Sequence, residues 1–129
     1  MSINILMVVL TLLESGQMSA AFVNTASMEE CERRSLMVRT VLETTGARIQ
    51  QIACRQSTAR FTSFSHDDGS PETQHMHYVI QIDPQQASIM VLPPGHTCKN
   101  SNDEDDNTIS YCATSTQSLL LQDAPGTRP

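Results

Sequence analysis

Four cysteines, arranged as two pairs, constrain the fold of this 129-residue chain more than any other feature. Between Cys31 and Cys54 the sequence predicts one helix and one returning strand. The helix, which ends near Thr45, advances about 21 Å at roughly 1.5 Å per residue. The strand, which starts near Ala47, returns about 23 Å at roughly 3.3 Å per residue. Because bridged Cα atoms lie within roughly 7 Å of each other, these matched lengths predict a Cys31–Cys54 disulfide.

The second pair, Cys98 and Cys112, is predicted to close the base of a polar, acidic loop. A bridge around a loop of this size stabilises the fold by about 3 kcal/mol on the chain-entropy model. Four cysteines allow three pairings, and the sequence alone does not exclude the other two. Reduced, unpaired cysteines are the alternative to both bridges.

The segment after Ser27 carries several helix signals. Ser27 followed by Glu30 is a capping box, in which each side chain accepts a hydrogen bond from a backbone N–H of the first turn. Gly46 suits the left-handed position that ends a helix. Residues at three- and four-residue spacing form one stripe that is expected to face the core. This stripe consists of Cys31, Ser35, Val38 and Leu42, flanked by Val41.

After the second cysteine, alternation of apolar and polar residues predicts strands. His75–Asp83 is the clearest of them, and 60–64, 87–92, 108–114 and the short 117–122 (a strand or a turn of helix) are further candidates. Because 87–92 is apolar on both faces, we expect it at the centre of the sheet. These patterns predict an α+β fold, with one N-terminal helix packed on a four- to five-stranded antiparallel sheet, stapled by two disulfides.

The first 21 residues are expected to be a signal peptide, because Ile3–Leu13 is an apolar run too short to span a bilayer. Small residues at 19–21, or at 24–26, offer a cleavage site. No Lys or Arg precedes the run, so an uncleaved segment is the alternative. The expected organisation is a signal peptide at 1–21, one domain at 22–122 and a disordered tail at 123–129. Export and an even cysteine count together favour a secreted or periplasmic protein.

The charge of the chain narrows the range of partners. A formal net charge of −6 argues against nucleic acid, because phosphate contacts need a basic surface. It also disfavours adsorption to an anionic membrane, and we expect no membrane span in the mature chain. After residue 60, acidic residues outnumber basic ones, and Lys99 and Arg128 are the only Lys or Arg residues. The sequence predicts no cofactor.

Two histidines are the best candidates for a metal site. His75 and His77 lie on one side of a predicted strand, roughly 7 Å apart, a workable distance for two ligands of zinc or copper. A third ligand would come from His66, Asp67 or His96. A solvated pair on the wet face of the strand is the alternative. The acidic stretch 103–107 lacks the glycine and glutamate of an EF-hand, so we expect a solvated loop there.

Catalytic patterns are missing from the sequence. It has no G-x-S-x-G elbow, no H-E-x-x-H pair and no phosphate-binding glycine loop. Most of the carboxylates fall in hydrophilic segments, where little raises the pKa for general acid work. We therefore predict that the protein is not an enzyme and has no catalytic residues.

Polar loops at the ends of hairpins are where binding residues tend to lie. We expect a small exported protein-binding domain, such as an inhibitor, accessory subunit or envelope factor, whose partner is another protein. The candidate contacts lie in two loops and are His66, Asp67, Asp68, Asp103, Glu104, Asp105 and Asp106. The alternative is a periplasmic or secreted carrier that binds a metal or small ligand with His75 and His77.

Overall fold

A computed structural model describes residues 4–62, 76–93, 95–103 and 107–121 of the protein. Two short strands, β4 and β9, form a separate ribbon, and the remaining strands form one main sheet. The strands are β1 (Asn4–Leu12), β2 (Met18–Thr25), β3 (Arg48–Ser57), β4 (Arg60–Phe61), β5 (Met76–Ile82), β6 (Ala87–Val91), β7 (Ser101–Asp103), β8 (Thr108–Ser115) and β9 (Leu119–Leu121), and the helix is α1 (Met28–Thr44). The predicted α+β class, with one helix and two disulfides, is confirmed.

The main sheet is larger than predicted and is not wholly antiparallel. Its strands follow the order β3-β1-β2-β8-β5-β6, and β7 pairs with β8 off this path. The pairing of β2 with β8 is parallel, at Ser19 and Thr114, whereas the other strand pairs are antiparallel. The prediction of four to five antiparallel strands was therefore wrong in number and in direction.

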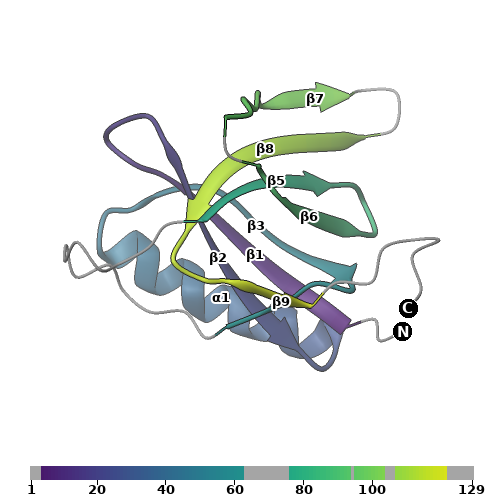
Figure 1. Cartoon of the computed structure of the whole chain (residues 1–129). Coiled ribbons are helices and arrows are strands. Elements are labelled where there is room, and N and C mark those ends of the chain that lie inside the picture. The colour runs from purple at the N-terminus through teal and green to yellow at the C-terminus, as the bar shows by residue number, and fades with distance from the viewer. Residues whose placement is uncertain (1–3, 63–75, 94, 104–106, 122–129) are drawn as a thin grey trace.

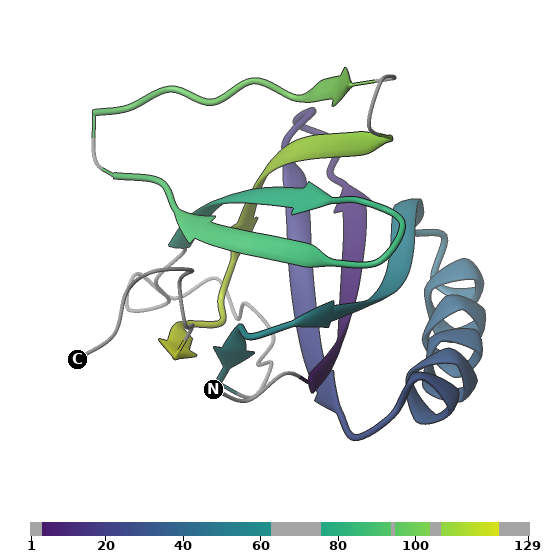
Figure 2. The ribbon, with the colours of Figure 1, turned by 90° about the vertical axis from the view of Figure 1, so that its right-hand side faces the viewer.

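The main sheet is rolled, so that its two edge strands meet (Figures 1 and 2). Gln56 at the end of β3 forms a bridge with Gln86 beside β6, and its N–H donates to the carbonyl of Gln85 at 3.0 Å. Arg55 Nε donates to the Asp83 carbonyl at 2.7 Å. These bonds close the roll at one corner, and the strands enclose a common interior.

Apolar side chains from the strands of the roll fill this interior. Three aromatic rings lie together in it. Phe22 and Phe61 are stacked with centroids 3.9 Å apart, and Tyr78 meets both rings edge-on, at 5.7 and 5.8 Å. The other buried members are Leu6, Val8, Leu10, Met18, Ala20, Ala53, Ala59, Ile80, Ile82, Ala87, Ile89, Tyr111 and Ala113.

Gln117 joins the C-terminal segment to this core, although it is a polar residue and only 1% exposed. Its Oε1 accepts from the Phe22 N–H, and its Nε2 donates to the carbonyls of Phe22 and Thr62, each at 2.7 Å. The side chain thereby pairs with β2 as a neighbouring strand would. Because a buried amide without partners costs roughly 1–3 kcal/mol per group, these bonds make its burial tolerable.

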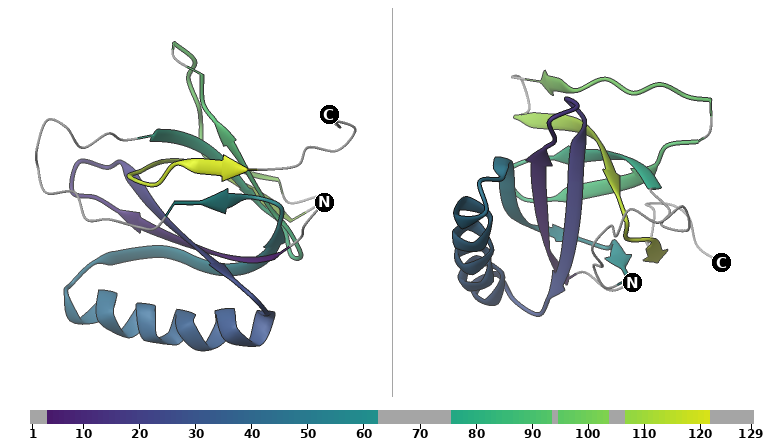
Figure 3. Two further views of the ribbon diagram at one scale, coloured as in Figure 1. Left: turned by 60° about the horizontal axis from the view of Figure 1, so that its bottom comes forward. Right: turned by 90° about the vertical axis from the view of Figure 1, so that its left-hand side faces the viewer.

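Helix α1 lies on the outer side of β1, β2 and β3 (Figure 3). It begins as predicted, since Ser27 is the N-cap and its hydroxyl accepts from the Glu30 N–H at 3.1 Å. It ends before Gly46, whose φ of +80° is left-handed. Val38 and Leu42 pack against Met7 and other side chains on the outer side of the sheet. Val41, predicted beside this stripe, is 62% exposed instead.

Both disulfides have the pairing expected from the sequence. Cys31 and Cys54 are joined with their Cα atoms 6.0 Å apart, which ties α1 to β3. Cys98 and Cys112 are joined at 5.9 Å, which ties the segment before β7 to β8. Cys31 is completely buried, whereas Cys98 and Cys112 are both partly exposed.

The apolar segment interpreted as a signal peptide forms β1 in this fold. Its residues 6–10 are at most 6% exposed, and the strand pairs with β2 on one side and β3 on the other. A short apolar run has the same sequence pattern in a doubly covered strand as in an export signal. Cleavage after Ala21 stays a prediction, and this fold opposes it because cleavage would remove β1.

The expectation that 87–92 forms a central strand was wrong. Strand β6 lies at the end of the strand order, with Met90 50% and Val91 44% exposed. Its inward residues, Ala87 and Ile89, are buried as the apolar pattern requires. Of its outward side chains, Ser88 is polar and Met90 is apolar, and nothing among the described elements covers either, so the pattern was ambiguous between centre and edge.

Candidate functional site

The rolled sheet has two outer flanks with different surfaces. The covered flank consists of β3, β1 and β2, and α1 lies over it. The open flank consists of β8, β5 and β6, with β7 beside β8, and α1 lies on the far side of the roll (Figure 2). A binding surface is therefore available either on the outer side of α1 or on the open flank.

The side of α1 turned away from the sheet carries apolar residues. Leu36 and Met37 are each 67% exposed and Val41 is 62% exposed. Together with Thr40, also exposed, these residues form what we call the outer helix face. A surface helix normally places charged or polar residues there, because that side meets water. Exposed apolar side chains gathered in one place indicate a contact surface.

One border of the outer helix face is acidic. Glu29, Glu32 and Glu43 are exposed and fall on the side of the helix where Leu36 lies, at helical spacing. On the other side, Glu30 is paired with Arg34 at 3.2 Å, so its charge is matched within the helix. Arg33 and Arg39, both exposed, lie four residues from Glu29 and Glu43, so a partner would meet apolar groups beside a border where acidic side chains outnumber basic ones.

On the open flank, a row of polar side chains crosses four strands. Ser101 pairs with Ser110, Ser110 with Gln81, and Gln81 with Ser88, in strands β7, β8, β5 and β6. We call these four residues the hydroxyl–amide row. They belong to the lining of a trough of about 410 Å³, together with Asp83, Gln86 and Thr108.

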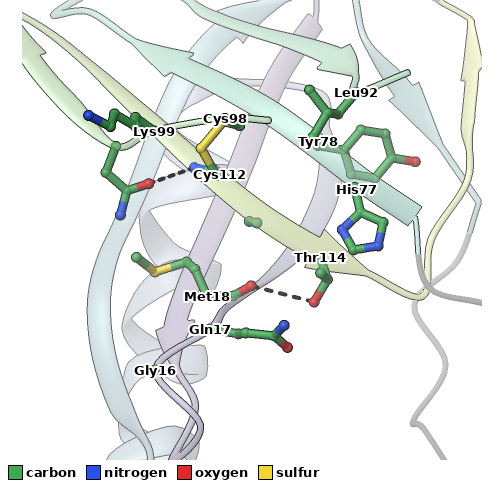
Figure 4. A pocket seen from close by; sticks show the side chains of 12 residues that line it. Gly16, Gln17, Met18, His77, Tyr78, Leu92, Cys98, Lys99, Cys112 and Thr114 are labelled. Carbon is green, nitrogen blue, oxygen red and sulfur yellow. Dashed lines mark hydrogen bonds between the residues drawn. A yellow bond between two sulfur atoms is a disulfide. The ribbon is translucent and has the colours of Figure 1, made fainter. Parts of the chain in front are cut away.

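A second hollow, of about 440 Å³, lies beside the exposed disulfide (Figure 4). Its lining includes Cys98 and Cys112, Lys99, His77 and Thr114. Lys99 is the only lysine of the chain. In Figure 4 the imidazole of His77 points towards Thr114, whereas the ammonium group of Lys99 points away from it. The polar groups of this hollow thus do not converge on one point.

The predicted metal pair is only partly placed by the structure. His77 is exposed on β5, and His75 lies outside the described residues, as do His66 and Asp67. His96 is exposed in the segment after β6. Within the described ranges, no group of three His, Cys, Asp or Glu side chains is close enough to hold a metal ion.

Most of the loop residues predicted to contact a partner lie outside the residues that the structure describes. His66, Asp67 and Asp68 belong to the undescribed segment 63–75, and Glu104 to Asp106 form another. The backbone of Asp103 ends β7, where it pairs with Thr108. Their part in binding stays a prediction.

Tyr78 has a perturbed phenol, but its position assigns it to the core. Burial raises its pKa above the usual 10.0, and a hydrogen bond from the Leu119 N–H partly opposes that rise. The hydroxyl also donates to the Gln117 carbonyl at 2.8 Å. It therefore helps to hold the C-terminal segment in place and is not displayed to a ligand.

Sequence reasoning missed both surfaces that the structure brings forward. Leu36 and Met37 fall off the predicted core stripe, and that displacement was the available signal for the outer helix face. The hydroxyl–amide row joins strands whose neighbours were unknown, so Ser88 and Ser110 had no reason to be grouped. Only the pairing of β6, β5 and β8 brings them together.

In the part of the chain that the structure describes, no helix is both long and apolar enough to cross a membrane. Comparison of the chain with protein-family models, with characterised proteins and with solved structures finds no match.

Proposed function

We propose that this protein is a small exported, non-enzymatic domain that binds another protein through the outer helix face, as an inhibitor, accessory subunit or envelope factor. One observation carries the proposal: Leu36, Met37 and Val41 on this face are each more than 60% exposed. Residues buried in a complex have to be exposed in the free protein, and a helix offers them on a rigid element.

The partner has an apolar groove. A helix that binds in such a groove presents apolar residues one turn apart, as Met37 and Val41 are, and Leu36 widens this surface beside Met37. Burying a large apolar side chain contributes about 1.5–3 kcal/mol, so three of them offset much of the roughly 4–15 kcal/mol that association costs in lost freedom. Met37 adapts its shape readily, which favours packing against an irregular surface.

The groove of the partner has a basic rim on one side. The acidic border formed by Glu29, Glu32 and Glu43 would face that rim, and opposite charges across an interface raise the association rate and fix its orientation. The formal net charge of −6 acts in the same direction at longer range.

Export and the lack of enzymatic activity are parts of the same proposal. Two disulfides favour an oxidising compartment. The phenol of Tyr78 has a raised pKa, but it is hydrogen-bonded within the core, so it provides no support for a catalytic role.

Site-specific photo-crosslinking of the full-length protein tests the proposal. A photo-reactive amino acid at Thr40, in cells that naturally produce the protein, is expected to give one discrete adduct. Met37→Glu should reduce the adduct at least tenfold, because it places a charge in the apolar contact. Higher salt should weaken capture, since the acidic border contributes attraction.

Met90→Glu is the matched control, because Met90 is also an exposed methionine but lies on the open flank. It should leave the adduct unchanged. Circular dichroism of both variants checks that each is folded. The proposal is wrong if Met37→Glu has no effect on the adduct, or if Met90→Glu alone abolishes it.

A further inference from the structure

We propose a second binding site, distinct from the outer helix face: the trough on the open flank binds a neutral, unbranched oligosaccharide through the hydroxyl–amide row and Asp83. The seven residues that line this trough all have polar side chains. None of the seven is cationic or apolar, so the lining is unsuited to anions and to apolar ligands. It is suited to a ligand that is itself covered in hydroxyl groups.

The chemistry of the row matches that of a sugar. A serine hydroxyl both donates and accepts hydrogen bonds, and a carboxamide such as that of Gln81 carries separate donor and acceptor atoms. A sugar hydroxyl has the same dual capacity. Gln81, Ser88 and Ser101 are exposed, so ligand hydroxyls can reach them without any movement of the sheet.

The spacing of the row favours an extended ligand. Its four members lie on four adjacent strands, and neighbouring strands are about 4.8 Å apart. The polar groups are therefore repeated at regular intervals along a line across the sheet. A linear chain of sugar rings presents hydroxyls at repeated intervals, whereas a single compact ion would contact one member only.

Asp83, two residues after Gln81, provides a fixed acceptor in the lining of the trough. Its Oδ1 accepts from the N–H groups of Gln85 and Gln86, at 2.8 and 2.6 Å. Its backbone carbonyl accepts from Arg55 Nε, which ties it to β3. The carboxylate is thus held in one orientation, and hydrogen bonds from hydroxyl groups to an ionised acceptor are stronger than neutral ones.

The size and the lining of the trough together set the affinity that we expect for the oligosaccharide. A volume of about 410 Å³ lies within the range of small-molecule sites. The lining offers no aromatic ring for a sugar to stack on, and its contacts are hydrogen bonds that replace bonds to water. We therefore expect a weak site, with a dissociation constant of about 1 mM.

Titration of the isotope-labelled protein, followed by amide chemical shifts, tests this site. The probes are linear trisaccharides of glucose, of mannose and of N-acetylglucosamine. At least one is expected to give saturable shifts at Gln81, Ser88 and Ser110. Gln81→Leu should weaken that binding at least fivefold, and Ser88→Val should also weaken it. Gln50→Leu, a matched change at an exposed strand glutamine on the covered flank, should leave it unchanged.

Three results would overturn the proposal. The first is no shift at these amides with any of the three trisaccharides at about 20 mM, roughly twenty times the expected constant. The second is binding that Gln81→Leu and Ser88→Val leave intact. The third is a response of the same amides to calcium chloride alone, which would assign the trough to a cation. Because the variants lie on the open flank, none of these results bears on the outer helix face.

Discussion

The two flanks of the rolled sheet share one interior but differ in what lies outside it. On the covered flank, outward residues such as Met7 and Val9 are buried under α1. On the open flank, the outward residues Gln81 and Ser88 meet solvent. The middle of β1 is thus buried on both faces, whereas β5 and β6 on the open flank are buried on one. The covered flank carries stability, whereas the open flank has outward positions that are available for binding.

The two disulfides follow the same division. Cys31–Cys54 lies between α1 and the sheet, with Cys31 completely buried. Cys98–Cys112 lies at the surface and lines a hollow. The first bridge therefore belongs to a packed layer, and the second constrains a surface segment that leads into β7.

Removing β1, the central strand of the covered flank, is expected to lower the free energy of unfolding more than any other change. A chain that begins at Phe22 lacks β1 and the first half of β2, and the five buried residues of β1 alone contribute about 2 kcal/mol each, about 10 kcal/mol together. That is comparable to the whole stability of a small domain, about 5–15 kcal/mol. We expect no cooperative thermal transition in circular dichroism. If the shortened chain melts as the full chain does, β1 is dispensable and the cleaved signal peptide gains support.

Removal of a disulfide is expected to have the next largest effect on stability, and the two bridges should differ in how much stability is lost. On the chain-entropy model each bridge contributes about 3 kcal/mol, and the sequence separations of 23 and 14 residues alter this by only about 0.4 kcal/mol. The Cys31→Ala/Cys54→Ala variant also loses buried packing, so urea unfolding should show it to be more than 1 kcal/mol less stable than Cys98→Ala/Cys112→Ala.

A mild reductant provides a second measurement on the unmodified protein. Mass spectrometry after alkylation should find Cys98 and Cys112 labelled first, because reductant reaches them without unfolding. Simultaneous reduction of both bridges would contradict the division between a packed and a surface disulfide.

Truncating two outward-facing valines, one on each flank, gives a matched pair of variants with smaller losses of stability. Val9 on β1 is 6% exposed beneath α1, and Val79 on β5 is partly exposed on the open flank. Val9→Ala should cost about 2 kcal/mol and Val79→Ala less than about 1 kcal/mol, since only the first leaves a cavity between two layers. Urea midpoints measure both. Equal losses would mean that the open flank is covered by a part of the chain outside the described residues.

In the interior that both flanks share, the buried phenol of Tyr78 is expected to make the fold less stable at high pH. Burial raises the pKa of the Tyr78 phenol above 10.0 in the folded state. Below about pH 10 the phenol is protonated in both states, and its contribution is complete. Above that pH the unfolded chain loses the proton first, so the free energy of unfolding falls by up to about 1.4 kcal/mol per pH unit until the folded group ionises.

Tyr78→Phe is the control for that pH dependence. It removes the bonds to Gln117 and from Leu119, so it is less stable at neutral pH, but its stability should fall less steeply between about pH 10 and 11. Urea unfolding at several pH values measures the slope. An unchanged slope in the variant would show that another group causes the loss.

Local features of the chain were predictable where a sequence pattern is compatible with only one local structure. The cap at Ser27, the left-handed Gly46 and the alternation in β5 each depend on neighbouring residues, and each was found. Chain geometry also brought Cys31 to Cys54. Such features do not depend on which strands lie side by side.

The segments that the sequence left ambiguous are those whose pattern fits two environments. The run in β1 suits a doubly covered strand and an export signal equally, and the pattern of β6 suits a centre and an edge. The parallel contact of β2 with β8 joins residues 95 positions apart, at Ser19 and Thr114, and no local signal marks it. The outer helix face was partly readable, because Leu36 and Met37 broke the stripe.

By itself the sequence determined the helix with its caps, the inward-facing alternation of the strands and a disulfide framework, because these follow from dihedral preferences and from distances along the chain. The tertiary structure alone decided the order of the strands, the roll that joins Gln56 to Gln86, and the division into a covered and an open flank. These depend on which apolar faces meet, and many arrangements of the same elements bury similar areas. The hydroxyl–amide row belongs to this second group, since only strand pairing brings its four residues together.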